Sequence, residues 1–114
     1  MEKAARVVDR GQIIADLVKA IAVGYSPERI ILFGSFAYGE PHADSDIDLL
    51  VIKDTGERFL DRIYNVRCLV SGLHPRVPMD VFVLTPEELA HRLRIGDQFI
   101  AEAVGRGLVL YESG

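Results

Sequence analysis

The 114-residue chain carries a net charge of −4, with 49% hydrophobic and 26% charged residues. Its length is close to the commonest domain size, and its acidic balance argues against stable nucleic-acid binding, which usually needs a basic surface. The first ten residues, MEKAARVVDR, lack the apolar segment of a signal peptide, and no apolar run approaches the ~18 residues of a membrane span. We therefore expect a single domain over residues 1–114 in a cytoplasmic protein, with its one cysteine, Cys68, as a small buried residue.

Hydrophobic periodicity predicts alternating helices and strands. Apolar residues at helix spacing indicate amphipathic helices, and short runs rich in β-branched residues indicate buried strands. Thr85, Pro86 and Glu88 form a capping-box helix start. The expected elements are helices over residues 7–23, 35–38, 57–70 and 86–104, the last with an interruption at Gly96, and strands over residues 29–33, 46–52, 77–84 and 108–111.

This order predicts an α+β fold of α/β-like character, in which a small sheet is flanked by helices. The pattern leaves open whether the sheet is mixed or parallel. The arginines of the expected helices, Arg62 among them, are assigned to solvated helix faces.

Carboxylates interrupt two of the expected strands. Asp46 and Asp48 share one face of the strand over residues 46–52, and Asp80 stands alone in the strand over residues 77–84. If these strands are neighbours, the three side chains converge. Packed carboxylates repel one another unless their pKa values rise or a cation binds them, and oxygen ligands of this kind suit Mg²⁺. The alternative is structural, with one aspartate capping a turn and another pairing with an arginine, and Asp44 is assigned to the polar loop.

Gly34 and Ser35 follow directly after the first expected strand. A glycine there lets backbone N–H groups approach a phosphate, and the start of a helix favours an anion. Alone, such a pair is usually only a turn. Together with two aspartates on the next strand, it favours a metal–triphosphate site and hence phosphoryl or nucleotidyl transfer.

The spacing of these residues resembles a known family. Gly34-Ser35, ten intervening residues and then Asp46-Ile47-Asp48 match the GS-x10-DxD motif of the DNA polymerase β-like nucleotidyltransferases. The surrounding segment ILFGSFAYGEPHADSDIDLLVI is similar to the minimal nucleotidyltransferase (MNT) branch, and VPMDVFVL falls where that family has its third acidic strand. The resemblance implies a polymerase β-like nucleotidyltransferase fold.

The resemblance also implies roles for the site residues. Gly34 and Ser35 would hold the β- and γ-phosphates of ATP or another NTP. Asp46 and Asp48 would ligate two Mg²⁺ ions, and Asp80 would complete one metal site and help to deprotonate the acceptor hydroxyl. Attack on the α-phosphate would release pyrophosphate.

The MNT branch further implies a protein partner. Its members are similar to antitoxins paired with a HEPN-domain toxin, and some transfer AMP to a tyrosine of that toxin. We therefore expect AMP transfer to a partner-protein hydroxyl, with a homo- or hetero-oligomer as the assembly. The alternatives are a non-catalytic antitoxin that neutralises its partner by binding, and an antibiotic-type small-molecule nucleotidyltransferase. One departure bears on activity: Tyr38 stands where many relatives carry arginine in the sequence GSxARG.

Overall fold

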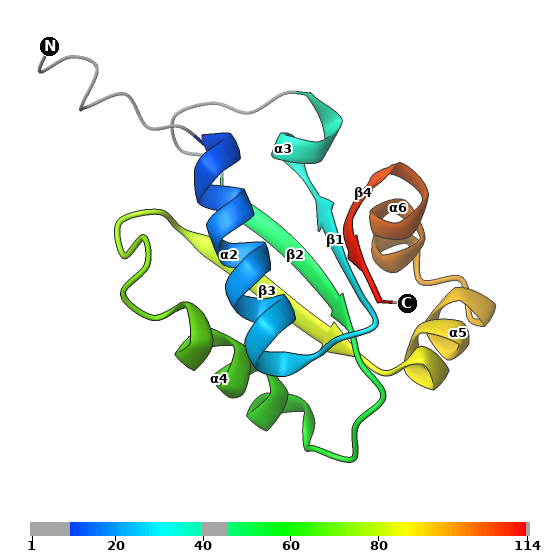
Figure 1. The fold of residues 1–114 in the computed structure, drawn as a ribbon. Coiled ribbons are helices and arrows are strands. Elements are labelled where there is room, and N and C mark those ends of the chain that lie inside the picture. Colours follow the sequence, from blue (N-terminus) through cyan, green and yellow to red (C-terminus); the bar gives the residue numbers. More distant parts are fainter. Residues whose placement is uncertain (1–9, 40–45, 114) are drawn as a thin grey trace, which may run out of the picture.

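The computed structural model describes residues 10–39 and 46–113 (Figure 1). The predicted order of helices and strands is confirmed in these ranges. The elements are α2 (Arg10–Tyr25), β1 (Arg29–Phe33), α3 (Ser35–Tyr38), β2 (Ile47–Ile52), α4 (Phe59–Val70), β3 (Met79–Leu84), α5 (Pro86–Arg94), α6 (Gln98–Arg106) and β4 (Leu108–Glu112).

The sheet is mixed, which answers the question that the sequence pattern left open. Its strand order is β3-β2-β1-β4. Strand β1 pairs antiparallel with both β2 and β4, whereas β2 pairs parallel with β3. A parallel pair needs a crossover connection, and α4 supplies it between β2 and β3. The N-terminal ends of β2 and β3 therefore lie together, beside the C-terminal end of β1.

Each face of the sheet has its own apolar core, and Figure 1 shows helices on both sides of the sheet. Helices α2 and α4 cover one face, where Ile47, Leu49 and Val51 of β2 point. Helices α5 and α6 cover the other face, where Leu50 and Ile52 point. This alternation confirms the predicted division of β2, because successive strand residues point to opposite faces.

Helix boundaries differ slightly from the sequence expectations. Helix α2 continues through Gly24 to Tyr25, and the expected residues 7–9 lie outside the described ranges, as does Asp44. The interruption at Gly96 is confirmed, since this glycine has φ 79° and separates α5 from α6. The capping box at Thr85 and Glu88 is also confirmed.

Two expectations for α4 were wrong. Cys68 is exposed, because the buried stripe of α4 consists of Arg62, Val66 and Val70, and Cys68 lies off that stripe. Arg62 was assigned to a solvated face, yet it is only 6% exposed.

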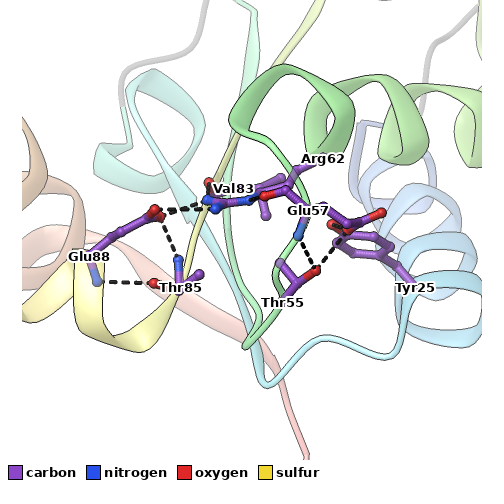
Figure 2. A network of polar contacts seen from close by, with 7 residues as sticks. All are labelled: Tyr25, Thr55, Glu57, Arg62, Val83, Thr85 and Glu88. Atoms are coloured by element: carbon purple, nitrogen blue, oxygen red, sulfur yellow. Dashed lines mark hydrogen bonds and ion pairs between the residues drawn. The ribbon is translucent and has the colours of Figure 1, made fainter.

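Arg62 is buried because several acceptors surround its guanidinium (Figure 2). It donates to Glu88 Oε1 at 2.7 Å and Oε2 at 3.2 Å, and also to the carbonyl oxygens of Val83 and Glu57. Glu88 in turn accepts a bond from the backbone N–H of Thr85. A bidentate pair of this kind has defined geometry, so Arg62 fixes α5 against the C-terminal end of β3.

None of the helices within residues 10–39 and 46–113 is long and apolar enough to cross a lipid bilayer.

Candidate active site

The candidate site begins with a row of side chains across three strands. Phe33 of β1 pairs with Asp48 of β2, and Asp48 pairs in register with Asp80 of β3. Paired residues in neighbouring strands point to the same face of a sheet. Phe33, Asp48 and Asp80 therefore lie side by side on the face that α5 and α6 cover. The two acidic strands are thus neighbours, which was the condition for their carboxylates to approach one another.

Asp48 is an aspartate of this row whose pKa is raised. Its side chain is partly buried, and the pKa of its carboxyl group is raised from 3.8 to about 6, chiefly by this burial. The charges of Asp80 and Asp46 contribute further to the rise of this pKa. Carboxylates that repel one another in this way gain from a bound cation.

Asp46 and Asp80 lie at the open side of the site. Asp46 is exposed and immediately precedes β2. The side chain of Asp80 is 54% exposed, and its Oδ1 lies 4.0 Å from Arg67 Nη2. An exposed ion pair of that length contributes less than ~1 kcal/mol, so a divalent cation could displace Arg67 from Asp80 at little cost.

The donor set fits Mg²⁺ in its chemistry, but it is not gathered as a ready-made cage. Across residues 10–39 and 46–113, no three His, Cys, Asp or Glu side chains are close enough to form a metal-binding cluster. Two or three carboxylates at a solvent-accessible site suit Mg²⁺, which keeps several bound waters and also binds phosphate oxygens of a substrate.

Gly34 lies directly against Asp48. A Cβ atom added at Gly34 would collide with Asp48 Oδ2, and the backbone has φ 77° and ψ −159°. Only glycine adopts this conformation readily. The carbonyl oxygen of Gly34 accepts bonds from Ala37 and Tyr38 N–H, which close the turn of α3. Gly34, which directly precedes Ser35 and α3, therefore lies beside Asp48. The expected binding of phosphates by Gly34 and Ser35 stays a prediction.

Tyr38 packs against α6. Its hydroxyl donates to the carbonyl oxygen of Glu102 at 3.4 Å, and the guanidinium carbon of Arg106 lies 4.0 Å from the ring centroid. This agrees with a packing role for Tyr38. It also places the guanidinium of Arg106, from α6, over the Tyr38 ring.

An aromatic cluster borders the acidic row. The rings of Phe33, Phe82 and Phe99 lie within 5.5–6.2 Å of one another, centroid to centroid. Sequence reasoning did not single out these residues. Their meeting depends on the break at Gly96, which turns α6 back over the sheet, and no local pattern predicts where Phe99 then lies.

Comparison with known proteins agrees with this fold. The sequence model of the family "Polymerase beta, Nucleotidyltransferase" matches residues 16–113, which is most of the chain. The chain belongs to this nucleotidyltransferase family. No match was found among curated protein sequences.

Solved structures with a similar fold include two with related descriptions. One is a proposed nucleotidyltransferase from Sulfolobus solfataricus, with 21% identity, a TM-score of 0.61, and coverage of 89% of this chain and 78% of that one. The other is a chain of a toxin–antitoxin complex solved with AMP-PNP, with 23% identity, a TM-score of 0.60, and coverage of 93% and 75%. At such identities the likeness supports the fold alone.

Proposed function

We propose that this protein is a Mg²⁺-dependent nucleotidyltransferase that transfers AMP from ATP to a hydroxyl group of a partner protein in the cytoplasm. The single observation that carries the proposal is the in-register pairing of Asp48 with Asp80 directly beside Gly34. This pairing places two carboxylates, which could bind a cation, next to a glycine whose backbone carries no side chain. That combination suits a metal–triphosphate rather than a free metal ion.

Each residue has a defined part in the proposed reaction. When bound, Mg²⁺ would neutralise the triphosphate and the developing charge at the α-phosphate. Asp46 and Asp48 would bind the metal ions, and Asp80 would lie next to the acceptor hydroxyl and help to remove its proton. Gly34 and Ser35 would hold the β- and γ-phosphates, because the glycine leaves room for close approach.

A protein acceptor is supported by the open surface of the domain. Strand β4 is an edge of the sheet, and its side chains Leu108, Val109 and Leu110 are exposed. Exposed apolar edge strands are common sites of pairing with another chain. The similar chain in a toxin–antitoxin complex bound to AMP-PNP also supports a partner, for which we propose a HEPN-domain toxin.

The direct test is label transfer to the product of the adjacent gene. We expect ATP labelled at the α-phosphate to label that partner in the presence of Mg²⁺. The Asp48→Asn variant should lose the label, whereas Asp54→Asn, which alters an exposed carboxylate after β2, should retain it. An unlabelled partner, or full labelling by Asp48→Asn, would contradict the proposal.

A second candidate is neutralisation by complex formation alone. The incomplete gathering of the carboxylates and the presence of Tyr38 favour it. Under this hypothesis, a variant carrying both Asp46→Ala and Asp48→Ala would still protect cells that express the partner. Loss of protection with an intact complex would instead favour the catalytic function.

A further inference from the structure

We propose that Phe99, supported by Phe33 and Phe82, is the surface on which the nucleotide base stacks. This inference rests on the proposed nucleotide-binding function and adds the part of the site that recognises the base. It concerns a side chain that comes from α6, far in the sequence from the glycine and the aspartates.

The sheet register places Phe99 next to the acidic row. Phe33 is paired with Asp48, and Phe82 lies two residues after Asp80 on the same face of β3. Strand β2 runs between β1 and β3. The Phe99 ring contacts Phe33 at 5.5 Å and Phe82 at 5.6 Å, so it lies over β2 close to Asp48.

The Phe99 ring is held but not covered. It makes T-shaped contacts with both neighbouring rings, with interplanar angles of 88° and 73°. It nevertheless remains 54% exposed, whereas Phe33 is buried. A large ring that two neighbouring rings contact and that stays open to solvent beside a polar site can present a flat apolar surface to a planar ligand.

The backbone that carries Phe99 is also fixed. Asp97 caps α6 by accepting a bond from the N–H of Ile100 at 3.1 Å, and it pairs with Arg92 of α5 at 2.9 Å. Because Arg62 fixes α5 to β3, the position of Phe99 relative to Asp80 is set through a continuous series of contacts. The ring is therefore preorganised, which lowers the entropic cost of binding.

Stacking on a phenyl ring has a predictable selectivity. Every base has a π face, so stacking tolerates different bases, and larger ring systems cover more area. We expect purine nucleotides to bind more tightly than pyrimidine nucleotides. Inorganic tripolyphosphate, which has no base, should bind without any contribution from Phe99.

The test compares binding of ATP and of tripolyphosphate by calorimetry, both with Mg²⁺. For Phe99→Leu we expect affinity for ATP to fall about tenfold or more, as alanine substitution of stacking rings does, with unchanged affinity for tripolyphosphate. Phe99→Trp should retain ATP affinity. The control Phe59→Leu removes an exposed ring from α4, a helix that covers the opposite face of the sheet. It should leave the affinity for both ligands unchanged.

Three results would overturn the inference. Equal ATP affinity in Phe99→Leu and the wild type would show that the base does not stack there. A parallel loss for ATP and tripolyphosphate would assign Phe99 a structural role only. If the wild type bound neither ligand, the proposed function itself would fail together with the inference, whereas the first two results leave that function standing.

Discussion

Replacing Asp48 with asparagine should stabilise the fold. The folded protein raises the pKa of the Asp48 carboxyl group from 3.8 to about 6, chiefly through burial and then through Asp80 and Asp46. The proton is thus bound more tightly in the folded than in the unfolded state. The associated stability is fully present below about pH 4 and is lost as pH rises through about 6.

The size of the effect follows from that shift. A pKa change of this size corresponds to at most ~3 kcal/mol, and partial exposure to solvent reduces it to about 1–2 kcal/mol. Asparagine carries no charge at any pH, so Asp48→Asn should be more stable than the wild type at pH 7.5 by that amount. For a domain of this size, the melting temperature should rise by about 4–8 °C.

Thermal unfolding of both proteins from pH 4 to pH 8 measures this difference. Groups common to the two proteins cancel, so the gain should be near zero at pH 4 and should reach its plateau above pH 7. The control Asp54→Asn changes an exposed carboxylate and should stay within ~0.5 kcal/mol at every pH. A destabilised Asp48→Asn, or a gain that does not depend on pH, would refute the reasoning.

Two further predictions concern the backbone at Gly34 and the ion pair that the buried Arg62 makes with Glu88. Gly34→Ala should lower stability by about 1–3 kcal/mol because of its backbone conformation, and it should abolish MgATP binding because the added Cβ pushes Asp48 aside. The control Gly72→Ala has a similar φ of 83° but open space around it, so it should leave MgATP binding intact. Equal MgATP binding by the two variants in calorimetry would contradict this prediction. Arg62→Met should lower the free energy of unfolding by about 2–3 kcal/mol because it removes the bonds of a buried guanidinium to Glu88 and to two carbonyl oxygens. The same change at the exposed Arg92 should cost less than ~1 kcal/mol. Denaturant titration measures the free energy of unfolding of the Arg62→Met and Arg92→Met variants. Similar losses of stability in the two would show that burial of Arg62 does not matter.

Much of the fold was predictable because its signals are local. The apolar alternation of β2, the capping box at Thr85 and the break at Gly96 each depend on a few neighbouring residues. The burial of Arg62 was not predictable. Its acceptors come from β3, from α5 and from Glu57, which precedes α4. A charged residue between apolar positions normally marks a solvated face.

In the candidate site, too, some residues were predictable from the sequence and others were not. The sequence singled out Gly34, Asp46, Asp48 and Asp80, and the strand register shows that Asp80 lies beside Asp48. The roles of these four residues and of Ser35 in binding and catalysis stay predictions until binding is measured. Phe99 could not be found from sequence, because its neighbours Phe33 and Phe82 lie on two strands that are separated by a third.

The central claim is transfer of a nucleotidyl group, and the position of the label tests it most directly. The protein and its partner should be incubated with Mg²⁺ and ATP labelled either at the α-phosphate or at the γ-phosphate. The account predicts that α-label appears on the partner and that γ-label leaves as pyrophosphate. Transfer of γ-label to the partner, or transfer of neither label, would contradict it.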